Sequence, residues 1–137
     1  MLRIHASALR LVITIVILVS ACVGTRSNSF SLTLNTTNDS GVAGKVVLTD
    51  AGAGKTKVEM SISGQPAGVD PATHIHNGTC AEISGVAYRL GHVTEGQSAT
   101  TLKVALDSLL TGKYLILVHP DTARLFEDVA CGDLPAR

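Results

Sequence analysis

The feature that most constrains the fold of this chain is a series of short segments in which apolar and polar residues alternate. In residues 57–63, the apolar side chains of Val58, Met60 and Ile62 are separated by polar ones. Successive side chains of a β-strand point to opposite faces, so this pattern predicts a strand with one buried face. The strands expected in this way are residues 30–34, 42–49, 57–63, 74–76, 85–90, 99–106, 113–119 and 131–134.

Turn-forming residues separate these segments, and residues 107–110 are expected to form a single helical turn. About eight short strands joined by turns are typical of an all-β antiparallel sandwich or barrel. Only 3% of residues are aromatic and there is no tryptophan, so the core must be built from valine, leucine, isoleucine and alanine. The length of 137 residues predicts one domain. The formal net charge is zero, which leaves no basic excess for binding nucleic acid.

Residues 1–21 have the features of a signal peptide and are not expected to belong to the fold. Arg3 and Arg10 are basic, and residues 11–19 form an apolar run that is too short to span a bilayer of about 30 Å. The segment Val19-Ser20-Ala21-Cys22 resembles the lipobox of bacterial lipoproteins, which implies that Cys22 is lipidated and becomes the N-terminus. Ordinary cleavage after Ala21 and an uncleaved anchor are the alternatives, and each of the three predicts export.

Export and lipidation at Cys22 imply a disulfide between the remaining cysteines and a tether before the folded domain. With Cys22 taken by lipid, Cys80 and Cys131 remain, and two thiols in an oxidising compartment are most simply a disulfide. Residues 22–29 are expected to form a tether between the lipid and a domain at residues 30–137.

The candidate functional residues are histidines. On a strand, His74 and His76 would lie on the same face, close enough to share one metal ion. The alternative is that they are two polar residues on a solvent-facing strand. His119 ends the apolar strand at 113–119, where an imidazole fits the rim of a sheet better than a core. Three imidazoles around one ion suit Cu(II) or Cu(I).

Residues 69–134 resemble the copper/zinc superoxide dismutase family. The segments that carry the resemblance, in the order found in the family, are His74-Ile75-His76, Gly78-Thr79-Cys80, Leu90-Gly91-His92-Val93-Thr94, Leu115-Ile116-Leu117-Val118-His119 and Ala130-Cys131-Gly132-Asp133. The resemblance implies a Greek-key β-sandwich and a disulfide between Cys80 and Cys131. It also implies a copper site made of His74, His76 and His119.

The chain departs from the family at three places. Residues 81–90 stand where the family has a long loop with its bridging histidine and zinc ligands, and they contain no histidine, so zinc is not expected. His92 falls where the family has no ligand and is expected to be a loop or strand-end residue. Asp128 stands where the family has an arginine that attracts superoxide. Arg124 is a candidate substitute if its loop folds back.

Two functions follow from these patterns. The first is an exported, zinc-lacking, superoxide dismutase-like copper lipoprotein, anchored through Cys22 to the bacterial cell envelope, with superoxide as a candidate substrate. The second is a non-catalytic binding or structural module of the same fold that has lost its metal chemistry. The missing zinc ligands and arginine leave the enzymatic activity undecided, and the sequence carries no sign of the oligomeric state.

Overall fold

The computed structural model describes residues 28–137. The expected signal peptide, Cys22 and most of the expected tether lie outside the described residues. The described chain forms eight strands and one short helix: β1 (Ser29–Thr36), β2 (Ala43–Gly52), β3 (Lys55–Ser63), β4 (Ala72–Thr79), β5 (Glu82–Arg89), β6 (Gln97–Leu102), α1 (Leu106–Leu109), β7 (Thr111–His119) and β8 (Ala130–Ala136). All strand pairs are antiparallel, which confirms the predicted all-β class with eight strands.

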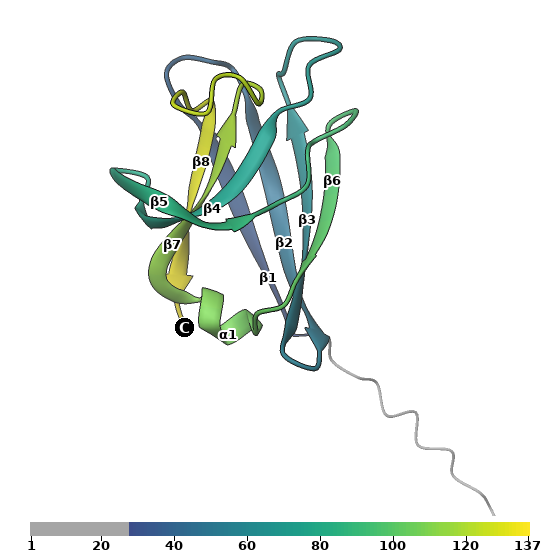
Figure 1. Cartoon of the computed structure of the whole chain (residues 1–137), viewed down its shortest axis with the longest axis vertical. Coiled ribbons are helices and arrows are strands. Elements are labelled where there is room, and N and C mark those ends of the chain that lie inside the picture. Colours follow the sequence, from purple (N-terminus) through teal and green to yellow (C-terminus); the bar gives the residue numbers. More distant parts are fainter. Residues whose placement is uncertain (1–27) are drawn as a thin grey trace, which may run out of the picture.

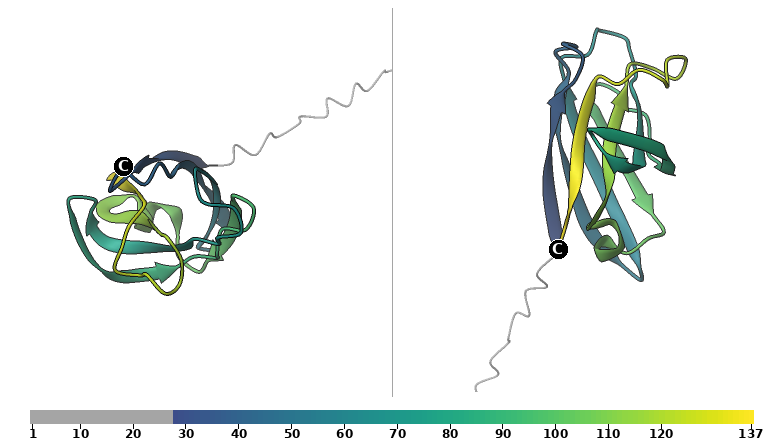
Figure 2. Two further views of the ribbon diagram at one scale, coloured as in Figure 1. Left: turned by 90° about the horizontal axis from the view of Figure 1, so that it is seen from above. Right: turned by 90° about the vertical axis from the view of Figure 1, so that its left-hand side faces the viewer.

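The strands form one curled sheet in the order β5-β4-β7-β8-β1-β2-β3-β6 (Figure 1). Strand β1 joins the two halves of this sheet. It pairs with β2 along residues 29–34 and then with β8 through Asn35 and Thr36. Viewed end-on, the sheet curls round on itself (Figure 2, left), and buried apolar side chains pack between its two halves. The result is a sandwich-like molecule whose edge strands are β5 and β6.

The interior is aliphatic, as the composition predicted. Val58, Met60 and Ile62 of β3 are 2%, 2% and 6% exposed, so the alternation read from the sequence places the correct face inward. They share one apolar cluster with Ile75 of β4 and Ile116 of β7 from the other half of the sheet. Burial of side chains from both halves holds the two layers together, because each buried aliphatic side chain stabilises the fold by about 1.5–3 kcal/mol.

Several boundaries differ from those expected. Strand β4 extends over Ala72–Thr79 rather than three residues, because both of its neighbours, β5 and β7, supply hydrogen-bonding partners. Strand β6 ends at Leu102, and the expected helical turn follows as α1. Residues 120–129 form the loop that joins β7 to β8. Within residues 28–137, no helix has the length and apolar character needed to cross a bilayer.

Candidate metal centre

The three predicted histidines lie on the outer face of the β4–β7 layer. In β4, Thr73 and Ile75 are buried toward the interior, whereas His74 and His76 alternate with them and point to the other face. His119 is the last residue of β7 and pairs with Ala72. Residues 72, 74 and 76 share one face of β4, so this register places the His119 ring beside the His-x-His pair.

The structure brings the three imidazoles together. Their ring centroids are 5.1 Å apart for His74 and His119, 5.6 Å for His76 and His119, and 5.8 Å for His74 and His76. The residues are 7%, 8% and 2% exposed in the order 74, 76, 119. One nitrogen of each ring lies within 4.8 Å of the others. Two nitrogens bound to one ion at about 2 Å lie at most about 4 Å apart, so small inward rotations of the rings would complete the contact.

Backbone carbonyls fix the orientation of two of the rings. The Nδ1 atom of His76 lies 2.8 Å from the carbonyl oxygen of Ser84, and Nδ1 of His119 lies 2.8 Å from that of Glu127. A carbonyl oxygen only accepts hydrogen bonds, so each Nδ1 carries the proton and donates it. Each Nε2 is therefore left with a free lone pair. A ligating histidine in a protein almost always donates its other N–H in this way.

The nitrogens left without partners are the ones that would face an ion. Nε2 of His76, Nε2 of His119 and Nδ1 of His74 are buried and have no hydrogen-bond partner. A buried polar atom without a partner costs about 1–3 kcal/mol, so three in one cluster need an explanation. A metal ion supplies one, because it would bind all three lone pairs at once. These residues form a buried cluster that could hold a metal ion.

Burial keeps two of the imidazoles, those of His74 and His119, in the neutral form that binds metals. Burial lowers the pKa of His74 to about 4, and the positive charges of His119, His76, Arg89 and His92 act in the same direction. Burial also lowers the pKa of His119, although its hydrogen bond to Glu127 opposes this shift. Both rings are therefore neutral near pH 7, and neutral imidazole is the ligand that a metal ion requires.

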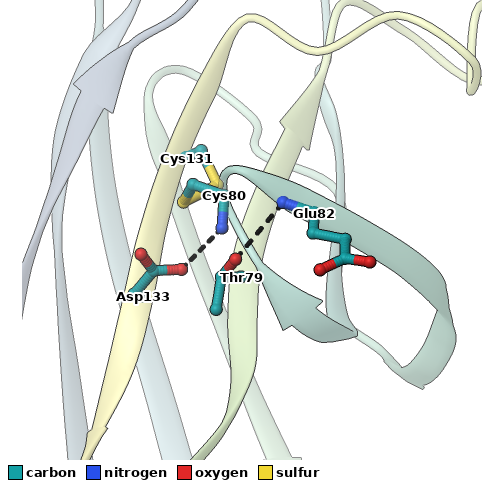
Figure 3. Close-up of a disulfide and its surroundings, with 5 residues drawn as sticks. All are labelled: Thr79, Cys80, Glu82, Cys131 and Asp133. Atoms are coloured by element: carbon teal, nitrogen blue, oxygen red, sulfur yellow. Dashed lines mark hydrogen bonds between the residues drawn. A yellow bond between two sulfur atoms is a disulfide. The ribbon is translucent and has the colours of Figure 1, made fainter.

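A disulfide joins Cys80 to Cys131, the pair that the resemblance implied, with Cα atoms 5.9 Å apart (Figure 3). It ties the turn after β4 to β8. The backbone N–H of Cys80 also donates to Oδ1 of Asp133 at 2.7 Å, and the N–H of Glu82 donates to Oγ1 of Thr79 at 3.2 Å. These bonds hold the start of β5, the strand whose Ser84 carbonyl orients His76.

A glycine permits the close approach of β5 to β4. Gly78 has a φ of 102°, a conformation that other residues rarely adopt, and a Cβ there would collide with the carbonyl oxygen of Glu82. The pairing between the two strands is interrupted by register shifts around His76. Such bulges often re-aim side chains next to functional sites. Here the irregular pairing lets the Ser84 carbonyl turn toward the His76 ring rather than continue the backbone ladder.

A cavity of about 230 Å³ leads to the cluster from outside. His76 and His119 lie at its inner end, and the loop between β7 and β8 contributes Glu127 and Asp128. The carboxylate of Asp128 acts electrostatically on His119 and favours its charged form. The remaining lining is apolar: Ile83, Leu117, Leu125 and Phe126.

Two of the other expected residues lie apart from the cluster. His92 is exposed in the segment after β5, as expected for a loop residue, and it is not one of the three clustered histidines. Arg124 is engaged by Asp121, with Nε and Nη2 at 2.9 and 2.7 Å from Oδ2, and its Nη1 lies 3.7 Å from Glu127. Cys22 lies outside the described residues.

Sequence reasoning missed the groups that orient the cluster. The carbonyls of Ser84 and Glu127 carry no signal in the residue type, since any residue supplies a carbonyl. Asp133 is part of the resemblance, but its bond to Cys80 was not foreseen. Arg89, which pairs with His74 across β4 and β5, was also missed, although the charge of a cross-strand neighbour could have been read once the register was known.

Comparison with known proteins does not assign the chain to a family. No protein-family model, no curated protein and no solved structure matches it. The features of the molecule that point to a function are the three histidines, the groups that orient them and the cavity that reaches them.

Proposed function

We propose that this chain is an exported copper-binding protein of superoxide dismutase-like, Greek-key architecture, lipidated at Cys22 and held at the bacterial cell envelope. The observation that carries the proposal is the set of three buried, unpartnered nitrogens on His74, His76 and His119. The signal-like segment and the lipobox-like residues before Cys22 support export and anchoring.

Copper is the metal that the donor set favours. Imidazole suits several divalent metals, and among them Cu(II) binds a given nitrogen site most tightly. Within residues 28–137, no fourth histidine, cysteine or carboxylate joins the cluster, whereas structural zinc sites take four protein ligands. Nδ1 of His74 and Nε2 of His76 and His119 would hold the ion. Copper, when bound, supplies one-electron chemistry between Cu(II) and Cu(I).

The chain's own residues would bind the ion, orient its ligands and restrict the access of water to it. Ser84 and Glu127 keep the protons of His76 and His119 on Nδ1, so that Nε2 stays free. Leu117, Leu125 and Phe126 line the approach and restrict water. The disulfide keeps the strand bearing Ser84 against the sheet.

Dismutation of superoxide is a second candidate function. A three-histidine cluster reached by an open cavity favours it, whereas the carboxylates of Glu127 and Asp128 oppose it because they repel an anion. The alternative is a non-catalytic module that only holds metal or a partner.

Metal titration tests the proposal. The protein should bind one equivalent of Cu(II), with a visible spectrum typical of imidazole ligands, and Zn(II) should not displace it. His119→Ala should abolish tight binding. His92→Ala, which removes an exposed histidine outside the cluster, should bind copper like the unaltered protein. Retained binding in His119→Ala, or equal loss in both variants, would refute the ligand assignment. A superoxide assay on the copper-bound protein then separates the enzyme from the module.

A further inference from the structure

The exposed apolar side chains of the described chain gather around the histidine cluster. Ile83, Val86, Leu125 and Phe126 are the large hydrophobic residues of residues 28–137 that remain exposed, and Phe126 is fully exposed. Three of them line the 230 Å³ cavity that ends on His76 and His119. No other large hydrophobic side chain of residues 28–137 is exposed to this degree, so this clustering marks the cavity as a distinct feature of the surface.

The acidic side chains that line this cavity are not balanced by any basic one. Glu127 and Asp128 line it, and no lysine or arginine does. Arg124, the nearest cation on the same loop, is held by the carboxylate of Asp121. It reaches Glu127 only at 3.7 Å and leaves Asp128 without an ion-pair partner in the described chain.

The inner end of the cavity supplies the second, independent observation. Nε2 of His76 and Nε2 of His119 are buried and unpartnered, and both residues line the cavity. The path therefore passes two carboxylates between apolar walls and ends on two free nitrogen lone pairs. Apolar walls around charges of one sign focus the electric field and raise the local concentration of ions of the opposite sign.

We propose that this cavity is a cation-selective entrance through which copper ions reach the three histidines, with Glu127 and Asp128 as the groups that attract them. The cargo is the copper cation itself, and small anions such as superoxide are disfavoured. The inference rests on the proposed function, since it assumes that the cluster binds copper. It deepens that proposal by assigning the site to the capture of a cation rather than the turnover of an anion.

The two carboxylates can be neutralised without touching the bonds that build the site. Glu127 orients His119 through its backbone carbonyl, and Asp128 accepts the Asn38 side-chain amide through its backbone carbonyl as well. The variant Glu127→Gln/Asp128→Asn keeps both carbonyls and removes only the charges. A matched control is Glu59→Gln/Asp107→Asn, which changes the net charge equally at exposed positions on β3 and α1, where neither side chain lines the cavity.

The experiment is stopped-flow capture of Cu(II) by the purified full-length chain in detergent, followed by the absorbance of the bound ion. At low salt, neutralising the pair should lower the second-order rate constant about tenfold. The difference should shrink as salt is raised, because the Debye length falls from about 30 Å at 0.01 M to about 3 Å at 1 M. The control variant should capture copper at nearly the unaltered rate.

Anion binding supplies the converse measurement. Azide titrated into the copper-bound protein should bind more tightly to the neutralised variant than to the unaltered protein. Equal capture rates in the unaltered and neutralised proteins would refute the proposed entrance but leave the proposal of copper binding intact. The entrance would also be refuted if the control variant captured copper as slowly as the neutralised variant. A variant that loses both copper capture and azide affinity would also overturn it, since the carboxylates would then support structure rather than selectivity. Failure of the unaltered protein to bind copper would overturn this inference and the proposed function together.

Discussion

Removing the Cys80–Cys131 disulfide should destabilise the domain and loosen the histidine cluster at the same time. The bond closes a loop with a sequence separation of 51 residues. For a loop of that length, the chain-entropy model assigns a stabilisation of about 4 kcal/mol. A domain of this size has a free energy of unfolding of about 5–15 kcal/mol, so the single bond accounts for a large part of it.

The perturbation is the double variant Cys80→Ala/Cys131→Ala, compared with the unaltered protein in urea. With an m-value of about 1.5 kcal/mol/M, a loss of about 4 kcal/mol moves the unfolding midpoint down by about 2.7 M. Alanine is chosen because Cys131 is 3% exposed in an apolar cluster, where serine would bury a hydroxyl. Adding a reductant should reproduce the loss in the unaltered protein and leave the variant unchanged.

The same variant should weaken copper binding although every ligand is present. Without the bond, the turn at Cys80 is held to β8 by the hydrogen bond to Asp133, and β5 carries the Ser84 carbonyl that orients His76. Loss of such an orienting partner costs about 10–100-fold in metal affinity. A midpoint shift below about 0.5 M would refute the loop argument. Unchanged copper affinity in the destabilised variant would refute the link from the disulfide to His76.

Three further predictions concern the core, the buried imidazoles and the metal. Ile75→Ala, at a side chain that is 0% exposed, should lower the free energy of unfolding by about 2–5 kcal/mol, whereas a change within about 0.5 kcal/mol would contradict the packing described. The metal-free protein should lose stability as the pH falls from 6.5 toward about 4, because in this range His74 binds a proton in the unfolded chain but not in the folded one. Urea titrations at several pH values should show a smaller dependence of stability on pH in His74→Gln. Free copper at about a hundredfold excess over its dissociation constant should add about 2.7 kcal/mol of stability, seen as a higher melting temperature that a chelator reverses and that His119→Ala lacks.

The strand pattern was predictable because burial follows the alternation of side chains. Val58, Met60 and Ile62 are interior residues, and α1 begins one residue before the expected helical turn. Strand ends were less predictable, since they depend on which neighbour supplies hydrogen bonds. The expected strand at 74–76 grew to eight residues because β4 lies between β5 and β7, and no local pattern encodes that pairing.

The histidine cluster was predictable in its members but not in its orientation. The two-residue spacing of His74 and His76 defines one face, and His119 ends an apolar strand, so the three could be named from the sequence. The choice of coordinating nitrogen depends on the Ser84 and Glu127 carbonyls, which are properties of the folded backbone. The same holds for Arg124, whose pairing with Asp121 is a local contact that the residue types permit but do not dictate.

X-ray absorption spectroscopy of the copper-bound protein tests the central claim most directly, because it counts the ligands around the ion. The structure predicts three imidazole nitrogens at about 2 Å, from His74, His76 and His119, and one fewer around the copper that His119→Ala holds only weakly, at a large excess of metal. A copper environment with fewer than three imidazoles in the unaltered protein, or one that does not change in His119→Ala, would contradict it.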